Sequence, residues 1–226
     1  MEVKKPEIFE NKNIIKIQAE IIYDDTSKTD LLFYEFDKKY LPYVTKSADP
    51  YLLSLLPLAF DIGQNLKLNL PVDEVLLNNI NKIQLVLKSW YPSKEIIPVE
   101  TQILQKTKLS KNNKTGLFFS GGVDSFYAAI KYSDDIDYLI FILGFDISCS
   151  QNEDSIKILN KNLSNIAEKL QKEIIIISTN LRETRFKSLK WLYNYGFGLA
   201  STAIILESLY SKVLISANRK FIDYKN

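Results

Sequence analysis

The stretch 116–130, GLFFSGGVDSFYAAI, holds the residues whose types and spacing best suit chemistry. Gly121 and Gly122 are adjacent in a chain with only seven glycines, and they follow a short apolar run. Paired glycines permit backbone dihedrals closed to other residues and leave no Cβ to obstruct a ligand. Successive N–H groups of such a loop converge on an anion, and a following helix adds unsatisfied donors and partial positive charge. The stretch therefore predicts a phosphate-binding loop.

The side chains beside the glycines fit a polyphosphate that carries a metal ion. Ser120 and Ser125 can donate hydroxyl hydrogen bonds to phosphate oxygens. Asp124 would repel a bare phosphate, so we expect it to hold Mg²⁺, which neutralises the phosphates. The loop is neither the Walker type, GxxxxGK[ST], nor the dinucleotide type, GxGxxG. The alternative without function is a Ser-Gly-Gly turn that caps a helix.

The second half of the chain must position this loop, and its pattern alternates between apolar strands and amphipathic helices. The expected strands are 115–119, 137–143, 173–178 and 212–216, and the expected helices are 123–132, 153–170, 182–192 and 197–210. This alternation indicates an α/β fold, a parallel sheet covered by helices on both faces. Ligands bind such sheets outside the carboxyl ends of the strands, where the loop would lie.

The first half has a different pattern and predicts a smaller α+β unit. The apolar stretches 13–23 and 31–36 are separated by a polar turn, which is typical of a hairpin. One helix is expected from about Asp49 to Gly63. A second is expected between Pro71 and Pro92 with Asp73 as its cap, followed by a strand at 95–103.

A lysine-rich segment, 105–114, separates the two patterns. Charge runs mostly solvate, so we interpret it as a linker, against the alternative of a phosphate-attracting arm. We therefore expect an N-terminal α+β domain at 1–110 and a nucleotide-binding domain at 111–226.

Composition excludes several kinds of site. The chain has no histidine and one cysteine, Cys149, which excludes His–metal centres, Ser-His-Asp triads, cysteine zinc sites and internal disulfides. The net charge of +2 is too small to argue for nucleic acid or an anionic membrane as a partner. Neither an apolar signal core nor an apolar run long enough to span a bilayer is present, so we expect a cytoplasmic protein.

SGGVDS at 120–125 resembles the SGGxDS signature of the PP-loop ATP pyrophosphatases, with all six positions satisfied. The resemblance covers about residues 115–217. Within it, FFSGGVDSF, LIFILGFDI and STNLRE are most similar to the group near 7-cyano-7-deazaguanine synthase. The resemblance implies a Rossmann-like sheet with strand order 3-2-1-4 and, less specifically, a variable domain before it.

The resemblance also implies ATP and Mg²⁺ as cofactors and an adenylating activity. A substrate oxygen attacks the α-phosphate, AMP is transferred and pyrophosphate leaves. The substrate would be an unknown carboxylate or carbonyl compound, activated for amide, nitrile or nucleobase chemistry. By position, the expected ATP-binding residues are Phe119, Ser120, Gly121, Gly122, Val123, Asp124, Ser125, Gly144 and Thr179.

The expected catalytic residues are Ser120, Asp124 and Arg182, with Asp124 also the metal ligand and Arg182 meeting the α-phosphate. The alternative for Arg182 is a solvated surface side chain. Gly144 would let adenosine approach the backbone, and its alternative is a simple turn at the end of a strand.

The sequence departs from the related group near its C-terminus. One cysteine cannot form the zinc site of 7-cyano-7-deazaguanine synthase, and the sequence ends ten residues after KVLIS, where the group continues with a histidine-containing segment. We therefore expect one open wall, closed by a dimer mate or a partner protein. The alternative function is a nucleotide-binding module or complex subunit with little turnover.

Two further features have both a structural and a functional interpretation. Cys149 is interpreted as a loop or core residue, against the alternative of a nucleophile. The aromatic residues Trp191, Tyr193, Tyr195 and Phe197 are interpreted as core, against the alternative of a surface on which a base stacks.

Overall fold

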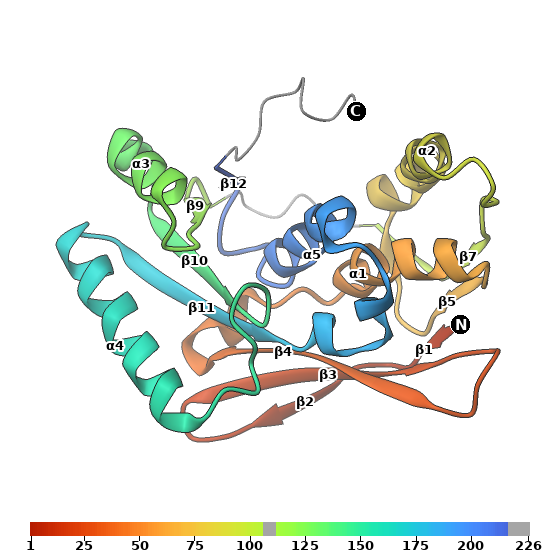
Figure 1. Cartoon of the computed structure of the whole chain (residues 1–226), viewed down its shortest axis with the longest axis horizontal. Coiled ribbons are helices and arrows are strands. Elements are labelled where there is room, and N and C mark those ends of the chain that lie inside the picture. Colours follow the sequence, from red (N-terminus) through yellow and green to blue (C-terminus); the bar gives the residue numbers. More distant parts are fainter. Residues whose placement is uncertain (106–111, 217–226) are drawn as a thin grey trace.

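One large sheet runs through the molecule, whose computed structural model describes residues 1–105 and 112–216. Within these residues ten strands follow the order β12-β9-β10-β11-β4-β3-β1-β5-β7, with β2 paired to β3 (Figure 1). The strands are β1 (Glu2–Val3), β2 (Glu7–Glu10), β3 (Ile14–Ile22), β4 (Thr29–Asp37), β5 (Leu66–Leu68), β7 (Val99–Glu100), β9 (Thr115–Phe118), β10 (Tyr138–Leu143), β11 (Glu173–Thr179) and β12 (Lys212–Leu214). A second, two-stranded sheet pairs β6 (Val72–Asp73) with β8 (Ile103–Leu104).

Five α-helices lie in the described residues. They are α1 (Asp49–Ile62), α2 (Glu74–Trp90), α3 (Val123–Lys131), α4 (Glu153–Lys169) and α5 (Trp191–Ile204). Short 3-10 turns join other elements: η1 (Lys38–Tyr43), η2 (Ser133–Asp135), η3 (Leu181–Glu183) and η4 (Arg185–Ser188). None of the helices described is long and apolar enough to cross a membrane.

The strands of the second half are parallel and confirm the expected order 3-2-1-4. β10 pairs in parallel with β9 and β11, and β12 pairs in parallel with β9. The molecule is therefore an α/β protein with a mostly parallel central sheet, compatible with a Rossmann-like fold. The carboxyl ends of β9, β10 and β12 meet at one edge, which is where the loop after β9 begins.

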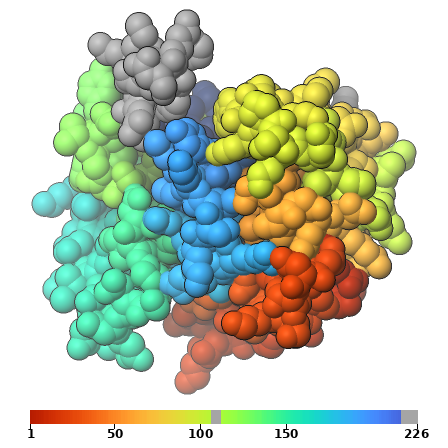
Figure 2. Space-filling model, turned by 45° about the vertical axis from the view of Figure 1, so that its right-hand side comes forward, coloured from red at the N-terminus to blue at the C-terminus, as the bar shows by residue number. Residues whose placement is uncertain are grey.

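Helices cover both faces of this part of the sheet. Leu139, Phe141 and Leu143 of β10 pack with residues of α3 and α4. Ile140 and Ile142, which alternate with them, face the cluster that contains α1 and the end of α5. Figure 2 shows α5 (blue) at the surface between the green-to-cyan α3–α4 side and the orange-to-yellow α1–α2 side.

Three local sequence signals in the first half are confirmed. β3 and β4 form the expected antiparallel hairpin. α1 ends at Gly63, which has a left-handed φ of 69° and caps the helix as glycine commonly does. Asp73 caps α2, because its side chain accepts hydrogen bonds from the N–H groups of Val75 and Leu76.

The two halves share one sheet and one core. β4 pairs antiparallel with β11, with Tyr34 opposite Thr179. Asn180 continues this ladder with its side chain: Nδ2 donates to the Leu31 carbonyl at 2.7 Å, and Phe33 N–H donates to Oδ1 at 3.0 Å. The large core cluster draws on both halves. The expected domain boundary at 110/111 lies outside the described residues.

The expected helix at 182–192 is wrong, and this segment forms η3 and η4 instead. Thr184 breaks the helical run, since its side chain accepts a hydrogen bond from Phe186 N–H and starts η4. α5 consequently spans 191–204, and not 197–210. The expected strand at 95–103 is likewise divided into the short strands β7 and β8.

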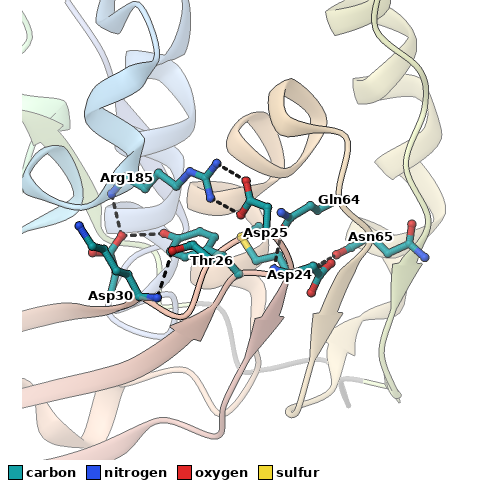
Figure 3. Close-up of polar contacts among 10 residues, drawn as sticks. Asp24, Asp25, Thr26, Asp30, Gln64, Asn65 and Arg185 are labelled. Carbon is teal, nitrogen blue, oxygen red and sulfur yellow. Dashed lines mark hydrogen bonds and ion pairs between the residues drawn. The ribbon is translucent and has the colours of Figure 1, made fainter.

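A polar clasp holds η4 against the β3–β4 turn (Figure 3). Arg185 forms two hydrogen bonds with the Asp25 carboxylate, at 2.6 and 2.7 Å. Asp30 accepts from Arg185 N–H and from Tyr23 hydroxyl, each at 2.7 Å. The Arg185 guanidinium holds the pKa of Asp25 below its ordinary value, so the stabilisation is present above that value and lost as pH falls through the folded-state pKa. The clasp fixes the segment 181–190, which leads to α5.

Candidate functional site

The loop between β9 and α3 has the geometry expected of an anion-binding loop. Gly121 has a φ of 79°, a left-handed conformation that favours glycine. Gly122 is the N-terminal cap of α3 and uses no side chain to cap it. Phe119 is buried at the start of the loop, and its N–H donates to the Ile140 carbonyl at 2.8 Å, which ties the loop to β10.

Two serine hydroxyls flank the glycines. Ser125 Oγ donates to the Gly122 carbonyl at 2.8 Å, and Gly122 N–H donates to Ser120 Oγ at 3.3 Å. The two hydroxyl oxygens lie 3.5 Å apart. The structure therefore brings together Ser120, Gly121, Gly122 and Ser125, as the sequence predicts.

The first turn of α3 supplies further donors. The N–H groups of Val123, Asp124 and Ser125 have no acceptor among the described residues. Unsatisfied N–H groups at a helix start carry partial positive charge and bind anions. The Val123 side chain is 87% exposed and leaves the turn open.

A cavity of about 420 Å³ opens onto this loop. Its volume is in the range of small-molecule sites. The loop side is formed by Ser120, Gly122, Val123, Asp124 and Ser125. The segment after β10 adds Phe145, Asp146 and Ile147, and the end of β12 adds Ile215 and Ser216. The cavity lies at the carboxyl ends of the strands, the place expected for a ligand in this kind of sheet.

The start of α5 forms the wall of the cavity with Trp191, Leu192, Tyr195 and Leu199. Trp191 packs edge-to-face on Phe145, with ring centroids 4.7 Å apart. Of the four aromatic residues interpreted as core, Phe197 packs against the core. Trp191 and Tyr195 also face the cavity, and Tyr193 is 46% exposed. An aromatic wall suits a planar ring.

Arg182 lies behind this wall. Its guanidinium donates to the Phe145 carbonyl and lies 4.7 Å from the centroid of the Trp191 ring. It is not among the residues that line the cavity. The structure therefore does not bring Arg182 to the loop as it brings Ser120 and Asp124, and the interactions of Arg182 support the aromatic wall.

Gly144 and Thr179 contact each other and do not line the cavity. A Cβ on Gly144 would lie 1.7 Å from the Thr179 carbonyl oxygen, and Gly144 has a φ of 111°. Thr179 is fully buried, and its hydroxyl accepts from Leu181 N–H at 3.4 Å. Glycine is thus needed at 144 for close packing against the neighbouring strand, as in the simple-turn alternative.

The cavity lining is acidic and aromatic. Its described residues include two carboxylates, Asp124 and Asp146, and no lysine or arginine. In the described part of the chain, no group of three or more acidic or cysteine side chains could hold a metal alone. A Mg²⁺ ion that takes one or two carboxylates and completes its shell with phosphates and waters fits such a site.

Sequence reasoning did not select Asp146 or Ser216. Asp146 directly follows the second apolar strand, a signal that could have identified it. Ser216 Oγ is buried without a hydrogen-bond partner among the described residues, and it borders a second hollow of about 640 Å³ beside α3 as well. Ser216 is therefore a further hydroxyl that lines both hollows at this edge of the sheet.

Cys149 is predicted to react slowly with alkylating agents. Burial, and then the hydrogen bond to Glu183 at 3.3 Å, raise its pKa to about 11. Since the thiolate is the nucleophile, the rate of iodoacetamide modification, followed by mass spectrometry, should rise about tenfold per pH unit between pH 8 and 10. Glu183→Gln should increase the rate at pH 8. A wild-type rate that is half-maximal near pH 8.5 and levels off by about pH 9.5, as for a free thiol, would contradict this expectation.

Comparisons with known proteins do not add to this picture. No protein-family model matches the chain, and no curated protein or solved structure matches it. The candidate site is thus defined by its own geometry: a glycine loop, the open first turn of α3, and an aromatic cavity with two carboxylates.

Proposed function

We propose that this chain binds MgATP with the triphosphate in the loop 120–125. The observation that carries the proposal is the left-handed Gly121 loop, which leads into the unsatisfied first turn of α3 at a 420 Å³ cavity. Such a loop stabilises several phosphate oxygens at once. The aromatic wall at Trp191 and Tyr195 offers a face for the base.

The activity we propose is adenylation by a PP-loop type mechanism. An oxygen of a carboxylate or carbonyl substrate attacks the α-phosphorus, the bond from that phosphorus to the α,β-bridging oxygen breaks, and pyrophosphate leaves with the electron pair. Charge builds on the pyrophosphate, where N–H donors of the loop stabilise it. Asp124 would hold Mg²⁺, which would supply further stabilisation of that charge. Support comes from the match of SGGVDS to its strand, loop and helix.

Product analysis tests the adenylation. The protein, MgATP and a panel of carboxylates are incubated, and nucleotides and phosphates are separated by chromatography. Pyrophosphate should form, dependent on one substrate, in an amount equal to the substrate adenylate plus the AMP that water releases from it. Release of ADP and phosphate would contradict the proposed bond cleavage.

A second candidate, a nucleotide-binding module without turnover, is favoured by one observation. Arg182 is engaged with Phe145 and Trp191, and the described lining of the cavity has no basic side chain for the α-phosphate. This function predicts MgATP binding with no AMP or pyrophosphate formed. The product analysis described above therefore distinguishes the adenylating enzyme from the module without turnover. A partner protein or dimer mate that supplies a basic side chain for the α-phosphate would restore turnover.

ATP binding is expected to depend strongly on Mg²⁺. Two carboxylates and no basic side chain line the described cavity, so metal-free ATP meets net repulsion. Chelation with EDTA should weaken ATP binding at least ~10-fold by calorimetry, an effect of about 1.4 kcal/mol. Asp124→Asn should reduce the difference in affinity between MgATP and metal-free ATP. Asp134→Asn, an exposed site outside the cavity, is the matched control and should keep the wild-type difference.

A further inference from the structure

We propose that Asp146 binds the ribose hydroxyls of the nucleotide and so makes the site selective for a nucleoside triphosphate over bare polyphosphate. This inference rests on the proposed function and adds a specificity-determining residue to it. Asp146 is a carboxylate in the same cavity as the glycine loop, presented from the neighbouring strand.

The topology places Asp146 beside the phosphate loop. β9 and β10 are adjacent and parallel, with Phe118 opposite Ile140. β9 leads into the loop 120–125, and β10 ends at Leu143, three residues before Asp146. In dinucleotide-binding sheets, a carboxylate after the strand next to the glycine loop accepts a hydrogen bond from the ribose. Here too a carboxylate follows the strand next to the glycine loop, and both line one cavity.

The segment that carries Asp146 is held in place by three contacts. Gly144 N–H donates to the Ile147 carbonyl at 2.6 Å and closes a tight turn. Arg182 donates to the Phe145 carbonyl, and the Phe145 ring packs on Trp191. These contacts use the backbone and the neighbouring side chains of the turn. The Asp146 side chain is exposed and lines the cavity, so it is presented from a fixed backbone.

The chemistry of the surrounding wall restricts what this carboxylate would bind. Its neighbours Phe145, Ile147 and Trp191 are apolar or aromatic. A carboxylate accepts hydrogen bonds and repels phosphate, so it suits a pair of neutral hydroxyls held next to an aromatic surface. A nucleoside whose phosphates lie in the loop carries such a pair on its ribose. Binding of Mg²⁺ by Asp146 is the competing role, and the test separates the two.

Calorimetry with three magnesium-loaded probes tests the inference: ATP, 2′,3′-dideoxy-ATP and inorganic tripolyphosphate. Asp146→Ala should weaken ATP binding about 10- to 100-fold, the effect of losing one hydrogen bond to a charged acceptor. It should change tripolyphosphate binding less than about twofold. Dideoxy-ATP should bind wild type as weakly as ATP binds the variant, with little further loss in the variant, because both changes remove the same contact.

Asp134→Ala is the matched control, since Asp134 is an exposed aspartate outside the cavity and should leave all three affinities unchanged. An equal loss of ATP and tripolyphosphate affinity in Asp146→Ala would assign Asp146 to the metal and overturn the inference. Tight wild-type binding of dideoxy-ATP would overturn it as well. If wild type binds MgATP but Asp146→Ala binds it equally, the inference fails and the proposed function stands. If wild type binds neither MgATP nor tripolyphosphate, both fail.

Discussion

Gly122→Val is expected to abolish MgATP binding at concentrations where the wild-type protein is saturated. A Cβ at this position would lie 3.3 Å from Ser120 Oγ, and Gly122 itself lines the cavity. The two branches of valine would therefore occupy space intended for phosphate and displace the Ser120 hydroxyl. Loss of two hydrogen bonds to a charged ligand costs about 3–6 kcal/mol. The affinity measured by calorimetry should fall at least ~100-fold.

Gly196→Val is the matched control for this experiment. Gly196 lies in α5, and a Cβ there would meet no atom within 4 Å. The same change of side chain should thus leave MgATP affinity near the wild-type value, and valine in a helix interior costs no more than glycine. Circular dichroism of both variants checks that the fold is retained. Equal ATP affinity in wild type and Gly122→Val would exclude the loop as the phosphate site.

Gly144→Ala is expected to destabilise the protein by at least about 3 kcal/mol, through backbone strain and a steric clash together. The added Cβ would lie 1.7 Å from the Thr179 carbonyl oxygen and 2.9 Å from its carbon. Neither atom is at the flexible end of a side chain, so β10 and β11 must separate. Urea unfolding followed by fluorescence measures the loss.

Gly63→Ala separates the two causes of that loss. Gly63 has a left-handed φ of 69°, but a Cβ there would meet nothing within 4 Å. Only the strain of a left-handed alanine remains, about 1–2 kcal/mol. If the two alanine variants lose the same free energy of unfolding, the close approach of Gly144 to Thr179 does not exist in solution.

The features that could be predicted from the sequence depend on contacts between residues near each other in the chain. Gly63 ends α1 and Asp73 caps α2 because each acts on the backbone within four residues. The apolar runs of β10 and β11 predicted parallel strands, because a strand that is covered on both faces has apolar residues at nearly every position. The loop 120–125 was also predictable, because its glycines and serines determine the conformation of the backbone within the loop itself.

The features that could not be predicted depend on partners far along the chain. The segment 181–190 forms 3-10 turns held by Asp25 and Asp30, more than 150 residues earlier. Arg182 donates to Phe145, 37 residues earlier, and this contact left no periodic signal. The pairing of β4 with β11 is extended by the Asn180 side chain, which hydrogen-bonds to the β4 backbone as a strand would, and no propensity scale contains that information.

The pairing of β4 with β11 also determines how late in synthesis the sheet can be completed. One edge of β4 pairs with β11. This edge of the β3–β4 hairpin therefore stays unpaired during translation until Thr179 and Asn180 have been synthesised. At roughly 5–20 residues per second, the ribosome needs roughly 7–30 s to make the intervening stretch of about 140 residues. An unpaired strand edge is a template for wrong association throughout that interval. Glu35 and Asp37 place negative charges on the waiting strand, which discourage a second nascent chain from pairing there.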